Sequence, residues 1–232
     1  MHNSLYIDLL KRVLLDQIHN DDVKRVDGRD WPPQGFTMVG TRRLDNVQQC
    51  VEQVLKHNIP GDFFEAGVWR GGAAMFMRAL LKVANCTDRT VWLADSFEGL
   101  PPPKPGWAAD IGDTLHQHKE LAVSLETVKA NFSALNLLDD QVCFIPGWFH
   151  ETLYTTPVQS LAVLRLDGDM YESTYVSLEA LYDKVSLGGF VIVDDYGFLD
   201  SCKQAVHDFL TTRKLTPEII TIDWTGVYWR KE

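Results

Sequence analysis

The sequence contains few cysteines, and their spacing is not that of a metal site or a disulfide framework. Four occur in 232 residues, and no two of them form a CxxC pair. Zinc sites and small disulfide-bonded folds use closely spaced cysteines. Because the neighbouring residues are apolar, we expect buried thiols at Cys50, Cys86, Cys143 and Cys202.

A long apolar run and an excess of basic residues are also absent. No run approaches the roughly 20 apolar residues that span a bilayer, and the N-terminus lacks the basic-then-apolar order of a signal peptide. The chain has 22 basic and 32 acidic residues and a net charge of −10. Nucleic acids and anionic membranes bind basic surfaces. We therefore expect a cytoplasmic protein that binds neither nucleic acid nor membrane.

From Asp62 onwards, short β-rich runs alternate with helical patterns. The β-rich runs are DFFEAGV, TVWLADSF, QVCFIPGWF, LAVLRLDG and GGFVIVDDY, and the helical patterns cover residues 72–83, 121–135 and 173–185. This alternation predicts a mostly parallel sheet with helices on both faces. Two closing runs, EIITID and GVYWRK, predict a hairpin that adds an antiparallel edge strand, for seven strands in all. The length favours one α/β domain over residues 1–232.

Two segments lie outside this alternation. We expect residues 1–60 to form an N-terminal helical cap, with helices over Leu5–Ile18 and Leu44–His57 and a loop over residues 19–43. Residues 99–120 form a Pro- and Gly-rich insertion directly after a strand. Open α/β sheets bind ligands at the carboxyl ends of their strands, and long insertions there often act as lids. We therefore interpret residues 99–120 as an active-site lid.

Each of the first two strands ends on an acidic residue. Glu65 lies in DFFEAGVWRGG, whose glycines allow a ligand to approach the backbone, and Asp95 follows in LADSFEGL. An acid at the first position repels phosphate and attracts an amine, whereas an acid at the second can bind a ribose diol or cap the next segment. The absence of GxGxxG argues against a nicotinamide-dependent oxidoreductase. The pair favours S-adenosylmethionine, a nucleoside that carries an amino group.

Six segments together match the pattern of a known family. They are TMVGTRRLDN, DFFEAGVWRGGAAMFMRA, LADSFEGLPPP, HKELAVSLETVKANF, LRLDGDMYESTYVSLEALY and GGFVIVDDYG. They resemble the macrocin O-methyltransferase family, which methylates sugar hydroxyls of macrolide and aminocoumarin antibiotics using S-adenosylmethionine and Mg²⁺. The resemblance runs from about residue 5 to residue 230. It implies a Rossmann-like class I S-adenosylmethionine-dependent methyltransferase fold, a glycosylated small-molecule acceptor, and a homodimer or higher oligomer.

The resemblance also implies which residues surround the cofactor. Glu65 would bind its amino group and Asp95 its ribose, although Trp148, placed near adenine, could equally be a core residue. The other residues expected to contact the cofactor are Met38, Val39, Gly67, Val68, Trp69 and Arg70 at the methionine portion, Ser96 and Phe97 at the ribose, Ser124 at the carboxylate or adenosine, and Gly147, Trp148 and Phe149 at adenine.

Two later strands each end on a pair of carboxylates, Asp167 with Asp169 and Asp194 with Asp195. If these strands are neighbours, the carboxylates converge at one edge of the sheet and repel each other unless a cation is bound. All-oxygen coordination is the Mg²⁺ pattern, and the lack of His and Cys disfavours Zn²⁺. We predict Asp167, Asp194 and Asp195 as Mg²⁺ ligands, provided that the chain turns after Val193.

A sugar hydroxyl is a poor nucleophile until it loses its proton. A metal ion lowers the hydroxyl pKa, and a nearby carboxylate can take the proton. Asp169, expected on the same side of an extended segment as Asp167, is the predicted base. Asp167 is the alternative base, and a helix cap is the alternative role for Asp169. The remaining candidates, which we expect to be peripheral, are His116, His118 and His150.

Two other functions stay open on the sequence alone. Metal-assisted methylation also suits a catechol-like acceptor, because a catechol presents neighbouring hydroxyls as a sugar does. A non-catalytic binding protein is the other possibility, which the four intact aspartates make unattractive.

Overall fold

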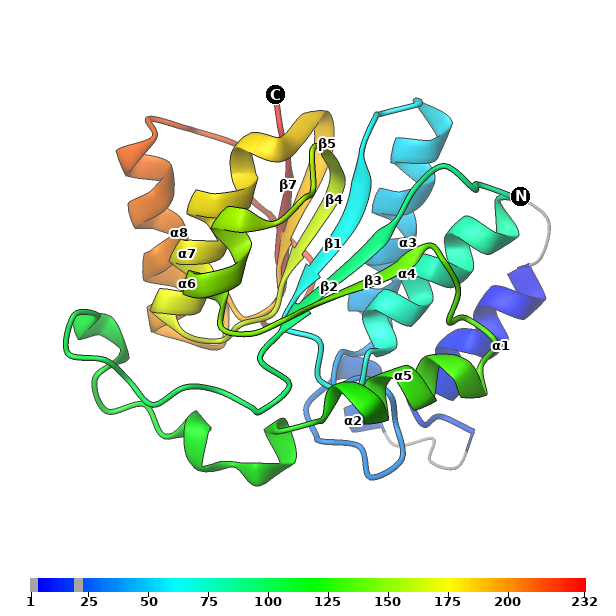
Figure 1. Cartoon of the computed structure of the whole chain (residues 1–232), viewed down its shortest axis with the longest axis horizontal. Coiled ribbons are helices and arrows are strands. Elements are labelled where there is room, and N and C mark those ends of the chain that lie inside the picture. The colour runs from blue at the N-terminus through cyan, green and yellow to red at the C-terminus, as the bar shows by residue number, and fades with distance from the viewer. Residues whose placement is uncertain (1–3, 19–22) are drawn as a thin grey trace.

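A seven-stranded sheet separates two layers of helices in the computed structural model, which describes residues 4–18 and 23–232 (Figure 1). The strand order is β3-β2-β1-β4-β5-β7-β6. Strands β1 to β5 pair in parallel, and β7 pairs antiparallel with both β5 and β6. The predicted mostly parallel sheet with a closing hairpin is confirmed. The strands are β1 (Asp62–Ala66), β2 (Val91–Asp95), β3 (Val142–Pro146), β4 (Leu161–Leu166), β5 (Val185–Val193), β6 (Ile220–Thr221) and β7 (Val227–Arg230).

Helices cover both faces of this sheet. α1, α3, α4 and α5 lie on one face, and α6, α7 and α8 lie on the other (Figure 1). Successive side chains of a strand point to opposite faces, so Phe63 packs in the first core and Phe64 in the second. Within the described ranges, no helix is both long and apolar enough to cross a membrane. The helices are α1 (Ser4–Leu14), α2 (Val23–Asp27), α3 (Thr41–Lys56), α4 (Gly72–Val83), α5 (Leu125–Ala134), α6 (Phe149–Thr152), α7 (Tyr171–Leu181) and α8 (Asp200–Thr212).

Several helices differ from the prediction: α1 ends at Leu14 instead of Ile18, α7 spans Tyr171–Leu181 instead of residues 173–185, and α6 and α8 were not predicted. The segment expected to be a loop contains α2, which at five residues is too short to give a periodic pattern. Helix α3 begins at Thr41 instead of Leu44. Helix α5 begins only at Leu125, because the Ser124 hydroxyl accepts the Thr127 N–H at 3.2 Å and caps the helix there.

The central strand β4 carries one charged residue in an apolar run. All six residues of LAVLRL are buried, as expected for a strand with helices on both faces. Arg165 is among them, and only 1% of its side-chain surface is exposed. A buried guanidinium needs acceptors close by, so the carboxylates of the neighbouring strand ends must lie within its reach.

Residues 99–120 leave the carboxyl end of β2 and run along that edge of the sheet (Figure 1). The Asp110 carboxylate accepts the N–H groups of Tyr171 and Glu172, at 2.7 and 2.9 Å, and ties the insertion to the first turn of α7. Farther along, the His118 ring packs edge-on against Trp31, with centroids 5.2 Å apart. The insertion therefore reaches from α7 to the N-terminal segment. Its short 3-10 turns are Ala108–Asp110, Leu115–Gln117 and Lys119–Leu121.

The turn between β1 and α4 passes very close to the end of β4. Gly67 has a φ of +89°, and a Cβ atom at this position would lie 1.7 Å from the Asp167 carbonyl oxygen. Glycine alone has neither a Cβ atom nor a steric penalty at positive φ. This close approach brings Glu65, two residues earlier, to the same pocket as Asp167.

We expect Gly67→Ala to lower the free energy of unfolding by about 2–4 kcal/mol, because the new methyl group adds a clash with β4 to backbone strain. Gly112→Ala is the matched control: Gly112 has a φ of +96°, but no atom lies within 4 Å of the position a Cβ would take. Backbone strain alone should cost this variant about 1–2 kcal/mol. Urea unfolding measures both, and equal losses would show that the contact with β4 is not the constraint.

Candidate active site

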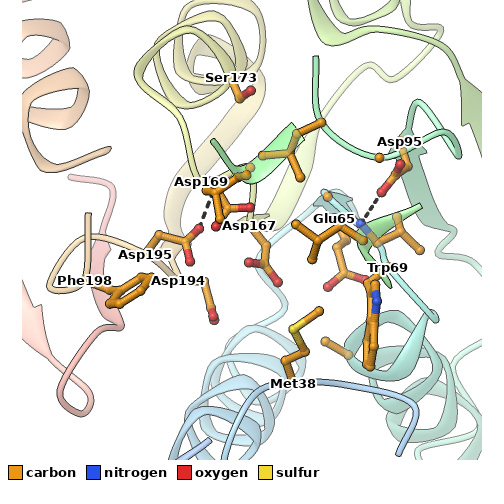
Figure 2. A pocket seen from close by; sticks show the side chains of 18 of the residues that line it. Met38, Glu65, Trp69, Asp95, Asp167, Asp169, Ser173, Asp194, Asp195 and Phe198 are labelled. Carbon is orange, nitrogen blue, oxygen red and sulfur yellow. Dashed lines mark hydrogen bonds between the residues drawn. The ribbon is translucent and has the colours of Figure 1, made fainter. Parts of the chain in front are cut away.

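A pocket of about 480 Å³ opens at the carboxyl ends of β1, β2, β4 and β5. This is the edge at which open α/β sheets bind ligands, and the volume suits a small molecule. Figure 2 shows Glu65, Trp69 and Asp95 on one side and the four aspartates of β4 and β5 on the other. The predicted residues that line the pocket are Met38, Glu65, Gly67, Val68, Trp69, Asp95, Ser96, Trp148, Phe149, Asp167, Asp169, Asp194 and Asp195.

The structure brings the strand-end aspartates together. β4 and β5 are paired neighbours, and one oxygen from each of Asp167, Asp194 and Asp195 lies within 4.8 Å of the others. The chain bends directly after β5 ends at Val193, so the two consecutive aspartates both reach the pocket. The condition set by the sequence is therefore met, and the cluster has the composition and spacing of a carboxylate site for a cation.

Asp169 reaches the pocket by a different route from the one expected. Its φ is +61°, so the chain turns after Asp167, and the expectation of an extended segment is wrong. The Asp169 N–H donates to Asp195 Oδ2 at 3.1 Å, which holds this turn against the end of β5. Met170 is the N-cap residue of α7, and the Asp110 carboxylate accepts the first N–H groups of the helix. A capping role for Asp169 is thereby excluded.

Arg165 connects the two sides of the pocket, although the sequence analysis did not identify it. Its Nη1 donates to Glu65 Oε1 at 2.6 Å and to Asp167 Oδ2 at 2.9 Å, and its Nη2 donates to Asp194 Oδ1 at 2.5 Å. The ends of β1, β4 and β5 therefore share one guanidinium. The available signal was a lone arginine inside the apolar run LAVLRL.

A second guanidinium reaches the cluster from α3. Arg43 pairs with Asp194, and its Nε lies 3.1 Å from Asp223 Oδ2. Only 6% of the Arg43 side chain is exposed. The sequence contains adjacent arginines in TRRLDN, and nothing in that pattern indicates which one is buried.

Carboxyl groups outnumber cations in the pocket. Five carboxyl groups lie in the pocket where β1, β4 and β5 end, and the guanidiniums that pair with these five, in the described part of the chain, belong to Arg43 and Arg165. Unpaired negative charge in a confined site favours protonation or the binding of a cation. The five carboxyl groups are those of Glu65, Asp167, Asp169, Asp194 and Asp195.

The pKa values follow this imbalance. Burial and then the neighbouring carboxylates raise the pKa of Asp169 to about 8 and the pKa of Asp195 well above its ordinary value. Burial also raises the pKa of Glu65 to about 8, against the opposing effect of Arg165. For Asp194 the two guanidiniums outweigh burial, and its pKa is lowered. The groups with raised pKa values mark where positive charge is missing.

Glu65 lines the pocket and has one carboxylate oxygen without a hydrogen-bond partner. Its side chain is 2% exposed, Oε1 accepts from Arg165, and the buried Oε2 has no hydrogen-bond partner. A buried carboxylate oxygen without a donor costs free energy. A ligand with an ammonium group would supply both the donor and the charge.

Asp95 supports the adjacent turns with the carboxylate that faces the pocket. Its Oδ2 accepts the Val68 N–H at 2.7 Å and its Oδ1 accepts the Phe97 N–H at 2.8 Å. The side chain therefore has the capping role considered as an alternative. Each carboxylate oxygen can accept a second hydrogen bond, so a diol can still bind there.

Some predicted cofactor residues do not line the pocket. The Arg70 side chain turns away, because its Nη1 donates to the carbonyls of Pro32 and Gly35 at 3.0 and 2.9 Å. Ser124 is exposed and caps α5. Trp148, by contrast, is only half-buried and lines the pocket, so it is not a core residue. The residues outside the pocket wall are Val39, Arg70, Phe97, Ser124 and Gly147.

His116 and His118 belong to the insertion, residues 99–120, and His150 lies beside it. His118 and His150 line the pocket, whereas His116 does not. Lys104 Nζ lies 3.4 Å from both ring nitrogens of His150 and donates to Glu172 Oε1 at 2.8 Å. These contacts join the insertion to α6 and α7, which accounts for His150 without a catalytic role.

Proteins of similar sequence and structure are methyltransferases. The family model described as macrocin-O-methyltransferase (TylF) matches residues 17–231. The chain is 48% identical to demethyldecarbamoylnovobiocin O-methyltransferase of Streptomyces niveus, over 99% of this chain and 94% of the relative. It is 50% identical to 8-demethyl-8-(2,3-dimethoxy-alpha-L-rhamnosyl)-tetracenomycin-C 4'-O-methyltransferase of Streptomyces olivaceus, over 98% of this chain and 92% of the relative.

The fold agrees with this result. The solved structure of the O-methyltransferase NovP is similar with a TM-score of 0.95 and 49% identity over 99% of both chains. The sheet order and the antiparallel β7 are those of a class I S-adenosylmethionine-dependent methyltransferase. With the family model covering almost the whole chain, the protein is an S-adenosylmethionine-dependent O-methyltransferase and belongs to the macrocin O-methyltransferase family.

Proposed function

We propose that the protein methylates a sugar hydroxyl of a glycosylated antibiotic or similar secondary metabolite, with Mg²⁺ bound by Asp167, Asp194 and Asp195. One observation supports this proposal most directly. In a single pocket, Glu65, whose Oε2 has no hydrogen-bond partner, lies opposite the aspartate cluster. The relatives' names support the acceptor class, since one is a rhamnosyl-tetracenomycin C 4'-O-methyltransferase. Mass spectrometry of a panel of glycosides and one catechol, incubated with S-adenosylmethionine, tests it: a methylated catechol with no methylated glycoside would overturn the sugar assignment.

The cofactor occupies the side formed by β1 and β2 in this proposal. Glu65 Oε2 accepts from the amino group, and Asp95 accepts from the ribose hydroxyls. Met38 and Trp69, which line the same side, cover the methionine portion. When bound, S-adenosylmethionine supplies the methyl group from a sulfonium, and the thioether that leaves is neutral, so no residue has to act as an acid.

The aspartate cluster suits a hard divalent cation. Asp167 pairs with Arg165 through Oδ2, and Asp195 accepts the Asp169 N–H through Oδ2. The other oxygen of each of these two carboxylates is available to a cation, and the excess negative charge favours binding. Both oxygens of Asp194 are already paired with guanidiniums, Oδ1 with Arg165 and Oδ2 with Arg43, so a cation would share this carboxylate with them. When bound, Mg²⁺ supplies the positive charge that stabilises the acceptor oxygen as its proton leaves.

Asp169 is better suited than Asp167 to accept that proton. Burial raises the pKa of Asp167, but its ion pair with Arg165 opposes that rise. Asp169 has no ion pair in the described chain, and burial raises its pKa to about 8, close to the pH at which a general base is most effective. Both side chains point into the same part of the pocket (Figure 2). The base is therefore assigned to Asp169, with Asp167 holding the cation.

Removing either cofactor anchor should weaken binding without unfolding the protein. We expect Glu65→Gln and Asp95→Asn each to reduce S-adenosylmethionine affinity by roughly 1–3 kcal/mol, because a charge-assisted hydrogen bond is lost. Glu126→Gln, which removes an exposed carboxylate on α5, is the control and should bind as the parent does. Titration calorimetry measures the affinities. Parent-like binding by both Glu65→Gln and Asp95→Asn would contradict the assignment.

Variants of the proposed Mg²⁺ ligands and of the proposed general base should differ in how their reaction rates depend on the Mg²⁺ concentration. Asp195 has no arginine partner, so Asp195→Asn removes ligand charge without breaking an ion pair in the described chain. This variant should need more Mg²⁺ for half-maximal rate. Asp169→Asn should keep the parent Mg²⁺ dependence and lose about 10²–10⁴ in kcat.

Cofactor binding serves as the control for both aspartate variants and should stay at the parent value. Full activity in excess EDTA would contradict the metal assignment. An Asp169→Asn rate within a few-fold of the parent would move the base to Asp167.

Ligands should protect the insertion from proteolysis. Lys119 lies exposed in residues 99–120, and closure over bound cofactor and acceptor would shield it. We expect trypsin to cleave after Lys119 more slowly when S-adenosylhomocysteine and acceptor are both present. Cleavage after Lys214, exposed beyond the end of α8, gives the internal control. An unchanged ratio of the two cleavage rates would rule out closure.

A further inference from the structure

An aromatic surface lies next to the aspartate cluster, on the side away from the cofactor anchors. It consists of Phe198 and Trp224, which both line the pocket. Figure 2 shows Phe198 beside Asp194 and Asp195, with Glu65 and Asp95 on the opposite side. The Phe198 side chain is 58% exposed. A large apolar side chain that is exposed inside a ligand pocket marks a surface that a ligand covers.

This aromatic surface is held in place by its surroundings. The Phe198 N–H donates to the Asp195 carbonyl at 3.0 Å, which fixes the residue one turn beyond the carboxylates. The Trp224 Nε1–H donates to the Asp27 carbonyl at 2.7 Å, and the Arg29 guanidinium lies 4.3 Å from the Trp224 ring centroid. The rings of Phe198 and Trp224 meet edge to face, with centroids 5.5 Å apart. The surface is therefore preformed.

The position of the reacting hydroxyl determines which part of the ligand covers the aromatic surface. In the proposed function the cofactor fills the side of Glu65 and Asp95, and the reacting hydroxyl lies at the aspartates. The rest of the acceptor must extend from the aspartates in the remaining direction, past Phe198. Because Phe198 is only three residues beyond Asp195, the first part of the acceptor to reach it is the ring that carries the hydroxyl.

We propose that Phe198, supported by Trp224, stacks against the C–H face of the sugar ring that is methylated and so determines acceptor specificity. This inference rests on the proposed function. A sugar ring directs its hydroxyls outward at the edge and its C–H groups at the faces, and these C–H groups carry partial positive charge that the face of an aromatic ring attracts. Phe198 has no polar group, so it selects a neutral apolar face. The nearby carboxylates disfavour an acidic sugar.

Acceptor kinetics of matched variants test this assignment. Phe198→Ala should raise the KM for a glycoside that the parent methylates by about tenfold, the scale of leaving part of a phenyl ring exposed. Phe198→Trp should restore it to within a few-fold, because an aromatic face is present again. Leu187→Ala removes a side chain that is 70% exposed on β5 and absent from the pocket wall, and should keep the parent KM.

Two further measurements show whether Phe198 acts on the acceptor or on its neighbours. The dissociation constant of S-adenosylmethionine and the Mg²⁺ concentration at half-maximal rate should not change in Phe198→Ala. A parent-like acceptor KM would overturn the stacking role, as would a raised KM that is matched by an equal shift in Mg²⁺ dependence. If the parent methylates no glycoside, the proposed function and this inference both fail. If it methylates one and Phe198→Ala keeps the parent KM, only this inference fails.

Discussion

Arg165 is the interaction on which the site depends. Its side chain, 1% exposed, extends from the last but one residue of the central strand β4 and donates to the carboxylates of Glu65, Asp167 and Asp194. A buried cation is costly unless its donors are paired, and so is each of these buried acids. Each of the strand ends of β1, β4 and β5 is therefore stable in this arrangement only when the other two are in place. The same guanidinium fixes the carboxylate on the cofactor side and two carboxylates on the acceptor side.

The fold supplies the close contacts that this network needs. Gly67 lets the β1–α4 turn touch the Asp167 carbonyl, and the turn at Asp169 is bound to Asp195. The insertion is attached to the same region, because Asp110 accepts the first N–H groups of α7, directly after that turn. Movement of the insertion would thus act on the helix that follows the proposed base, Asp169, and the proposed cation ligand Asp167. One short stretch, residues 167–172, therefore connects the carboxylates of the proposed reaction to the insertion that borders the pocket.

The sequence predicted the sheet, its hairpin and the meeting of the aspartates, because alternation of strands and helices fixes which strand ends share an edge. Most of the predicted site residues line the pocket, but not all of them do. Arg70 and Ser124 lie in the expected segments, yet one bonds backbone carbonyls of residues 32–35 and the other caps α5. Such orientations depend on long-range partners. Asp169 was misplaced for a related reason, since its positive φ is stabilised by Asp195, 26 residues away.

The free protein carries an electrostatic cost that its ligands relieve. Burial raises the pKa of Glu65 and of Asp169 to about 8. An acid whose pKa is raised on folding stabilises the fold only while it is protonated, and this contribution is lost as the pH rises through the folded-state pKa. Near neutral pH these two carboxyl groups are therefore mostly protonated, because ionising them inside the pocket costs free energy. In the proposed function, an ammonium group at Glu65 and a cation among the aspartates would replace those protons with bound charge. The acidic pocket, which destabilises the fold at high pH, would thus favour the binding of a cationic methyl donor.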